Sequence, residues 1–166
     1  VSLKSIDTRA SEFTNSFKIA VLSDSHDYYT DLKKQVDCIN AMADEIAFVM
    51  HTGDATNLGM LVECETFRSF VKVLMVHLLM VIGNHDMLTN GTSIYTQMFG
   101  KSLNYSFVFK QTKFILINNN NWESDGVAPD LGFVESELAS STQANKIILG
   151  HVQPDDSHRY KSSQIN

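Results

Sequence analysis

The sequence predicts an α/β fold that is built on a parallel βαβαβ unit and continues into a second sheet. Apolar runs at residues 17–22, 46–50 and 76–82 alternate with two stripes of apolar residues at helical spacing. Runs that are buried on both faces and linked by helices are typical of parallel sheets with right-handed crossovers. Two short β-rich runs, at 105–109 and 114–117, then indicate an antiparallel hairpin and hence a second sheet.

The two crossover helices are predicted from apolar residues that recur every three or four positions. The first stripe is formed by Leu32, Val36, Ile39 and Ala43, and the second by Cys64, Phe67, Val71 and Leu74. Later in the chain, residues 133–138 are predicted as a short helix and 146–149 as a further buried strand.

Length and composition indicate one folded domain. The 166 residues suit a single hydrophobic core, with residues 1–16 predicted as a polar N-terminal arm and 17–166 as the domain. The net charge is −6, from 13 basic and 19 acidic residues, and no basic run is present, which argues against a nucleic-acid-binding surface. Two cysteines, Cys38 and Cys64, form neither a disulfide framework nor a zinc knuckle.

The apolar runs are too short for a membrane span. The longest, residues 71–82, is interrupted by Lys72 and His77 and falls far short of the ~20 residues that cross a bilayer. The chain starts without Met and without the pattern of a signal peptide. We expect a soluble protein, with the cytoplasm slightly favoured over export, and the sequence leaves the oligomeric state open.

Polar residues suited to metal binding follow each predicted strand of the parallel unit. They are Asp24 and His26 after the first strand, Asp54 after the second, Asn84, His85 and Asp86 after the third, and His151 after the run at 146–149. The carboxyl ends of parallel strands lie at one edge of a sheet, so these side chains are expected to converge. Carboxylates, imidazoles and an amide oxygen without thiolates suit Mn, Fe, Zn or Mg.

These motifs differ in how specific they are. An Asp-x-His triplet such as 24–26 is common in loops, and Gly53-Asp54 is an ordinary turn dipeptide. The tetrapeptide Gly83-Asn84-His85-Asp86 is sharper, because average composition makes it a chance event on the order of one in a thousand in a chain of this length. Their order along the chain is harder still to attribute to chance.

In this order the motifs resemble the signature of the calcineurin-like metallophosphoesterase family. That signature runs Asp-x-His, Gly-Asp, Gly-Asn-His-Asp or -Glu, a further His, and a closing Gly-His-x-His; the first four correspond here to residues 24–26, 53–54, 83–86 and 151. The resemblance extends over about residues 17–154. It implies a metallophosphoesterase sandwich of two mixed sheets flanked by helices, with the βαβαβ unit inside it.

The resemblance also implies a role for each residue in a binuclear metal centre. Asp24 and His26 would bind the first of two divalent ions (Mn, Fe or Zn), Asp54 would bridge both, and Asn84 and His151 would bind the second. A hydroxide activated between the two metals would then attack phosphorus. His85 would donate a proton to the leaving group or stabilise charge, with Asp86 orienting its ring.

The sequence departs from the family pattern at its end. The closing Gly-His-x-His is absent, and 150–153 reads Gly-His-Val-Gln; we interpret His151 as the fourth motif and expect the domain to be truncated at its C-terminus. His158 is interpreted as a surface residue. Position 57 is Asn where purple acid phosphatases have a metal-binding Tyr, which disfavours an iron-tyrosinate enzyme.

Other polar and aromatic residues have weaker functional interpretations. His51, just before Gly53, is expected to be a hydrogen-bonded structural residue. Two segments are candidates for the rim of a substrate site. They are Tyr28 and Tyr29 beside the first motif, and residues 118–122.

The sequence thus favours an enzyme that hydrolyses a phosphate ester, either a phosphomonoesterase or a phosphodiesterase, on a phosphorylated small molecule or nucleotide. The alternative is a catalytically inactive binding or scaffold module that keeps the fold. A Rossmann domain is excluded because no Gly-rich turn follows the first strand.

Overall fold

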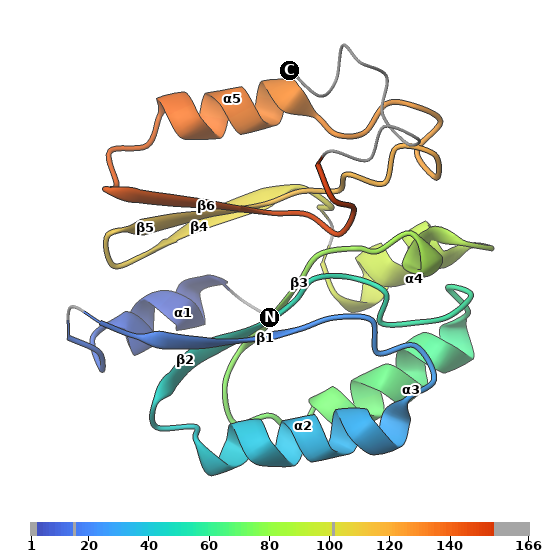
Figure 1. The fold of residues 1–166 in the computed structure, drawn as a ribbon, viewed down its shortest axis with the longest axis horizontal. Coiled ribbons are helices and arrows are strands. Elements are labelled where there is room, and N and C mark those ends of the chain that lie inside the picture. Colours follow the sequence, from blue (N-terminus) through green and yellow to red (C-terminus); the bar gives the residue numbers. More distant parts are fainter. Residues whose placement is uncertain (1–2, 15, 101, 155–166) are drawn as a thin grey trace.

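The computed structural model describes residues 3–14, 16–100 and 102–154, which form two three-stranded sheets packed face to face (Figure 1). The first sheet has the order β1-β2-β3, all parallel, and the second the order β4-β5-β6. The strands are β1 (Lys18–Leu22), β2 (Ile46–His51), β3 (Leu78–Met80), β4 (Tyr105–Phe109), β5 (Thr112–Leu116) and β6 (Asn145–Leu149).

The helices cover the outer faces of the two sheets. Helices α2 and α3 cross over between the parallel strands, and α5 lies over the second sheet on the far side of the molecule (Figure 1). The helices are α1 (Leu3–Ala10), α2 (Tyr29–Ala41), α3 (Leu61–Val71), α4 (Gly91–Met98) and α5 (Leu131–Ala139), with a short 3₁₀ turn η1 (His85–Met87). None of the described helices is long and apolar enough to cross a membrane.

The predicted α/β sandwich is confirmed, and its first sheet, as described, is parallel rather than mixed. In the second sheet β4 and β5 form the predicted antiparallel hairpin, while β6 joins β5 in parallel. The third strand is shorter than the predicted run at 76–82, although backbone hydrogen bonds from Val49 to His77 and from Val81 to His51 continue its pairing.

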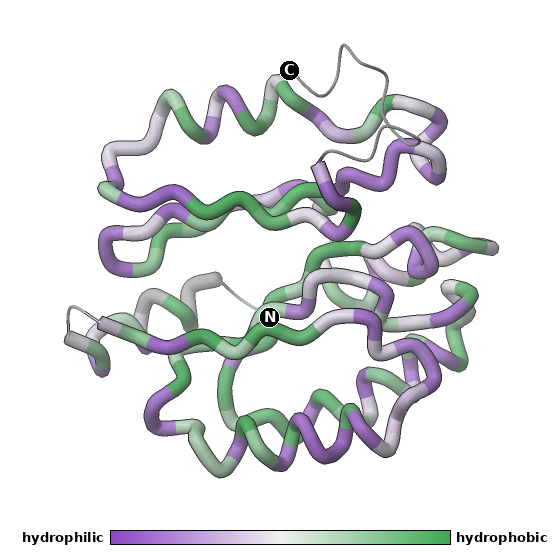
Figure 2. Tube along the Cα trace, in the orientation of Figure 1, coloured by the Kyte–Doolittle hydropathy of each residue, from purple (hydrophilic) through white to green (hydrophobic). Residues whose placement is uncertain are grey.

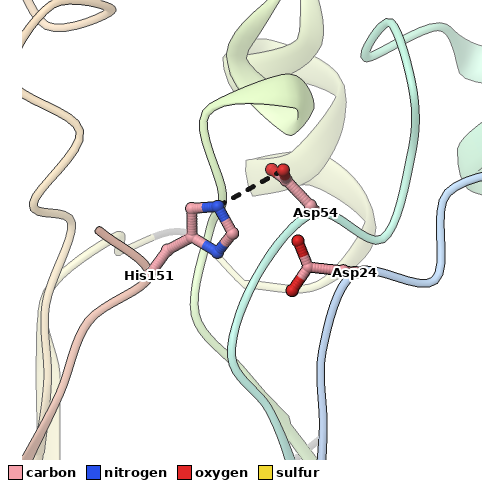
Figure 3. A group of neighbouring side chains, drawn as sticks. All are labelled: Asp24, Asp54 and His151. Carbon is pink, nitrogen blue, oxygen red and sulfur yellow. Dashed lines mark ion pairs between the residues drawn. The ribbon is translucent and has the colours of Figure 1, made fainter. Parts of the chain in front are cut away.

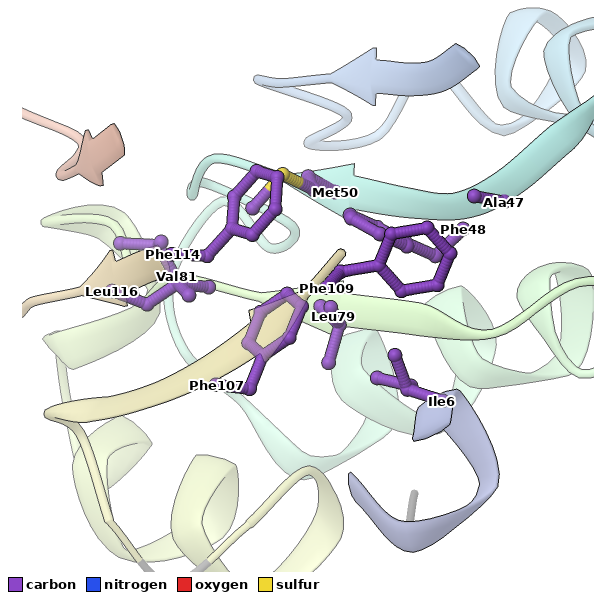
Figure 4. Packing of buried hydrophobic residues seen from close by; sticks show 10 residues of the cluster. All are labelled: Ile6, Ala47, Phe48, Met50, Leu79, Val81, Phe107, Phe109, Phe114 and Leu116. Carbon is purple, nitrogen blue, oxygen red and sulfur yellow. The ribbon is translucent and has the colours of Figure 1, made fainter. Parts of the chain in front are cut away.

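The core between the sheets is rich in phenylalanine (Figure 4). Phe48 of β2 is fully buried, and its ring lies 5.3–5.5 Å from the rings of Phe107, Phe109 and Phe114 in the second sheet. Rings at this distance add specific edge-to-face attraction to the burial of apolar area. Figure 2 shows hydrophobic segments along the strands of both sheets. Aromatic rings therefore pack together with aliphatic side chains to hold the two sheets.

The predicted polar arm contains a helix instead. In α1, Ile6 is buried in the inter-sheet core and Ala10, one turn later, packs against that cluster. Arg9 donates a hydrogen bond to the carbonyl of Ile46 at 2.9 Å, which ties the helix to the start of β2. No helix was predicted in this arm, because the helix depends on contacts with a strand 37 residues away in sequence.

The run at 146–149 does form a strand, but the prediction that it is buried was wrong. In β6, Ile147 and Ile148 are 40% and 46% exposed, since β6 is an edge strand in the described part of the sheet. Val21 of β1, the edge strand of the first sheet, is 56% exposed for the same reason. Helix α4 lies between the predicted third strand and the predicted hairpin, where no element was predicted.

Candidate metal centre

The register of the parallel strands brings the predicted ligands to one edge of the molecule. Leu22 pairs with His51, and His51 pairs with Met80, so the three strands end at the same level. In the second sheet Leu116 pairs with Leu149 in parallel. The loops that follow these strands are therefore neighbours in space although they lie about 30 residues apart or more in the sequence.

Asp24, Asp54 and His151 form the centre of the site (Figure 3). One ligand atom from each lies within 4.8 Å of the others, and the three side chains reach the same point from different chain segments. The Nε2 atom of His151 lies 3.3 Å from Oδ2 of Asp54. Asp54 is almost completely buried, whereas Asp24 is open to solvent. A small ion could therefore reach this point from the side of Asp24.

His26 and Asn84 complete the group on either side of Asp54. The Nε2 atom of His26 is 3.7 Å from Oδ2 of Asp54 and 3.9 Å from Oδ1 of Asp24. Oδ1 of Asn84 is 3.1 Å from Nε2 of His151. All five predicted ligands thus converge, with Asp54 between an Asp24–His26 pair and an Asn84–His151 pair.

Three histidines of the site are held through Nδ1 by carbonyl oxygens of the segment 52–57. His26 contacts the carbonyl of Thr56 at 3.1 Å, His151 that of Thr52 at 3.0 Å, and His85 that of Asn57 at 2.7 Å. A carbonyl only accepts, so Nδ1 carries the proton in each ring and donates. In His26 and His151 the Nε2 atom then faces the carboxylates, which is the arrangement that orients histidine ligands of metals.

Two glycines allow the ligand loops to approach this closely. A Cβ atom at Gly53 would lie 2.5 Å from Nδ1 of His151, and one at Gly83 would lie 2.1 Å from Oδ1 of Asp54. Gly53 also has φ of +113°, which favours glycine. Glycine therefore precedes Asp54 and Asn84 because the backbone there touches other ligands of the site.

The ligand loops also contain strained backbone. Asp24, His26 and Asp54 have φ of 54°, 40° and 54°, in the left-handed region that residues with a Cβ atom rarely adopt. Hydrogen bonds from the N–H of Asp24 to Gly53 and from that of His26 to Asp54 hold the first two loops in this form. Such strain is concentrated at functional sites.

The electrostatics of Asp54 and His151 are coupled. Burial raises the pKa of Asp54, but the hydrogen bond and charge of His151 and the backbone N–H of His85 outweigh burial, so the pKa is lowered. Burial likewise lowers the pKa of His151, and the contact with Asp54 outweighs it and raises the pKa. Each group therefore stabilises the charged form of the other.

A family model described as calcineurin-like phosphoesterase matches residues 17–165 of the chain, nearly its whole length. The chain belongs to the calcineurin-like phosphoesterase family. The prediction drawn from the motifs is thus confirmed, and members of this family are metal-dependent hydrolases of phosphate esters.

One solved structure supports the fold. A purple acid phosphatase from seeds of yellow lupin (Lupinus luteus) superposes with a TM-score of 0.62 at 14% identity, over 83% of this chain and 31% of that one. A predicted phosphoesterase from Streptococcus pneumoniae TIGR4 is 16% identical over 78% of this chain and 59% of that one, with a TM-score of 0.41. The chain thus spans about a third of the lupin phosphatase. No curated protein matches it.

Asp86 was predicted to orient the ring of His85, but its hydrogen bonds within the described structure go to other residues. Oδ1 of Asp86 accepts from the backbone and hydroxyl of Thr56 at 2.9 and 2.8 Å, and Oδ2 accepts from Gly83 at 3.0 Å and Ala55 at 3.3 Å. Burial raises the pKa of Asp86, and these hydrogen bonds oppose it. Asp86 therefore holds the loop that carries Asp54, while the carbonyl of Asn57 orients His85.

The Asn tract contributes to the centre, which the sequence interpretation missed. Residues 118–121 are buried rather than forming an exposed rim. Oδ1 of Asn119 accepts from the backbone of His151 at 2.9 Å and of Val152 at 3.1 Å, and Nδ2 of Asn120 donates to the carbonyl of Ile82 at 2.9 Å. The tract thus links the loops of His151 and Asn84. Its position directly after a buried strand was the available signal.

The remaining residues singled out in the sequence have structural roles, are exposed, or lie outside the described part of the chain. His51 is fully buried, accepts from the N–H of Gly53 and donates through Nε2 to Ser25 at 2.9 Å, as expected of a structural histidine. Tyr29 stacks on Phe70, while Tyr28 is exposed. His158 lies outside the described residues.

Proposed function

We propose that the chain hydrolyses a phosphate monoester or diester, using two divalent metal ions held by Asp24, His26, Asp54, Asn84 and His151. The observation that carries this proposal is the convergence of five side chains with ligand atoms. Two of them, His26 and His151, contact backbone carbonyls through Nδ1, so that Nε2 faces the site. The substrate would be a phosphorylated small molecule or nucleotide.

The donor set fits Mn, Fe or Zn. Carboxylate and amide oxygens with imidazole nitrogens suit these ions, and no thiolate is among the five. His26 and His151 both approach Oδ2 of Asp54, while its Oδ1 accepts the N–H of His85 at 2.9 Å, which supports Asp54 as the residue that would hold both ions. When bound, divalent ions supply Lewis acidity, which lowers the pKa of water and neutralises phosphoryl charge.

His85 is the group proposed to act on the leaving oxygen. Its ring lies edge-on to that of His26 with the centroids 4.9 Å apart, beside the ligands without being one of them. Its Nδ1 proton is committed to the carbonyl of Asn57, so Nε2 is the nitrogen available to the substrate. With Nε2 protonated as well as Nδ1, the ring could donate a proton from Nε2 to the departing alkoxide, which would speed the reaction by about 10²–10⁴-fold.

The test measures two quantities for the unaltered chain and for three variants. They are the rate of hydrolysis of p-nitrophenyl phosphate and bis-p-nitrophenyl phosphate, and the metal content. Asp54→Asn is expected to lose both metal and activity, because the amide cannot bridge two cations. His85→Ala is expected to keep both metals and to lose about 10²–10⁴-fold in rate. Asp44→Asn, an exposed carboxylate outside the site, is the matched control and should change neither.

Three results would contradict the proposal. The first is full activity in both Asp54→Asn and His85→Ala. The second is a metal-replete chain that binds no metal. The third is a chain that binds two metals and hydrolyses neither ester, which would support the inactive binding module instead.

A further inference from the structure

A cavity lies away from the metal centre, beside the edge strand β3. It has a volume of about 470 Å³ and is bordered by the end of α3, by β3 and by the end of α4. None of the five metal-ligand residues lines it. The volume is in the range of small-molecule pockets, which is ~300–1,000 Å³.

The walls of this cavity are mainly apolar. Val71 of α3, Leu78 and Met80 of β3, and Phe99 after α4 line it. Tyr95 of α4 also lines it; this side chain is 4% exposed, and its hydroxyl has no hydrogen-bond partner among the described residues. A buried hydroxyl without a partner is costly, and a bound ligand with a polar atom would remove that cost.

Two basic side chains border the cavity. Arg68 and Lys72 lie one turn apart at the end of α3. Among the described residues no carboxylate lines the cavity, although acidic residues outnumber basic ones by 19 to 13 in the chain. Within the described part of the chain neither Arg68 nor Lys72 forms an ion pair. The charges of these two side chains are therefore available to pair with a bound anion.

We propose that this cavity binds a small amphipathic organic anion, with a mainly apolar body against the β3 wall that carries one polar atom for the Tyr95 hydroxyl, and a single acidic head between Arg68 and Lys72. Apolar walls with few polar groups at defined places are typical of ligand sites. An acidic head at the rim and an apolar body inside match the two kinds of surface that the cavity presents. This site is independent of the phosphoesterase function and does not require it.

Two fluorescent probes with the same ring system test the proposal on the full chain. Anilinonaphthalene sulfonate carries an acidic head, and N-phenyl-1-naphthylamine is its neutral counterpart. The sulfonate should bind saturably, at one site per chain. The double variant Arg68→Gln/Lys72→Gln should raise its Kd by about three- to tenfold, because exposed charge contacts are individually weak, and should leave the Kd of the neutral probe unchanged.

Two further variants separate this cavity from other apolar surface. Lys33→Gln/Lys34→Gln removes two charges from α2, where these lysines pair with Asp37 and Asp31, and should leave sulfonate binding unchanged. Leu74→Trp, at the cavity wall, should weaken binding of both probes by filling the space. The proposal is overturned if sulfonate binding does not saturate, if it is equally affected by the two double variants, or if Leu74→Trp leaves it unchanged.

Discussion

The side-chain oxygen of Asn119 accepts a hydrogen bond from the backbone N–H of His151 at 2.9 Å, joining the loops that follow β5 and β6. The same oxygen accepts from Val152, and the amide nitrogen of Asn119 donates back to the Val152 carbonyl. The Asn119 side chain therefore fixes the backbone from which the His151 ring reaches Asp54. This makes Asn119 a positioning residue of the metal centre.

Asn119→Ala is expected to lower the affinity for divalent metal by about 10–100-fold, the usual cost of losing a group that supports a ligand. It should also destabilise the fold by about 1–3 kcal/mol, because two backbone N–H groups lose their acceptor. Asn121→Ala is the matched control, since this side chain donates to the carbonyl of Ala128 and not to the His151 loop. Calorimetric titration with Mn²⁺ and urea unfolding measure the two effects. Equal metal affinities of the two variants would contradict the assignment.

Asp86 offers a second test, because its two suggested roles predict different results. The hydrogen bonds to Gly83, Ala55 and Thr56 mean that Asp86→Asn places an amide N–H against backbone donors. We expect a loss of about 1.5–3 kcal/mol in the free energy of unfolding and weaker metal binding, since the Asp54 loop loosens. The loss of hydrolysis should follow the loss of bound metal. A reduced rate of hydrolysis at unchanged stability and unchanged metal content would instead support orientation of His85 by Asp86.

The ligands could be predicted from the sequence because each depends on local pattern and simple topology. Asp24, Asp54 and Asn84 each follow an apolar run within a few residues, and parallel strands bring such positions to one edge. The two sheets were likewise predictable from the change in pattern after residue 104. No long-range contact needed to be known for either inference.

The residues that support the ligands depend on contacts that the local sequence does not contain. Asparagine is usually exposed, so burial of residues 118–121 follows only from the pairing of β5 with β6. The groups that donate hydrogen bonds to Asp86 lie 30 or 31 residues away in sequence, apart from the N–H of Gly83. Helix α1 is stabilised by Arg9 reaching β2. In each case tertiary contact decides what the local pattern leaves open.

His51 makes the stability of the chain dependent on pH. Burial lowers its pKa from the ordinary 6.5 to about 4, with smaller opposing effects from Asp24 and Asp54. Between these values the unfolded chain binds a proton that the folded chain does not, so stability decreases as the pH falls from 6.5 to 4. The full effect is about 3 kcal/mol.

Urea unfolding of the metal-free chain at pH 7, 5.5 and 4.5 measures this effect when compared with His51→Gln, which cannot titrate. The difference between the two proteins is the relevant quantity, because Asp54 and His151 titrate in both. The variant's stability should fall less steeply over this range. Parallel curves for the two proteins would show that His51 is protonated in the folded state.

Two tyrosines near the edge of β3 give a matched pair for the last prediction. The Tyr105 hydroxyl donates to the carbonyl of Met80 at 2.8 Å and accepts from its N–H at 3.1 Å. A side chain of the second sheet thus provides hydrogen-bond partners for both backbone groups of Met80, a residue of the edge strand β3. Tyr105→Phe leaves both groups of Met80 without this partner and should cost about 1–3 kcal/mol, lowering the Tm by several degrees. Tyr95→Phe removes a buried hydroxyl that has no partner among the described residues, and should be neutral or stabilising in the absence of ligand. Thermal unfolding of both variants checks the prediction, which fails if Tyr95→Phe costs as much as Tyr105→Phe.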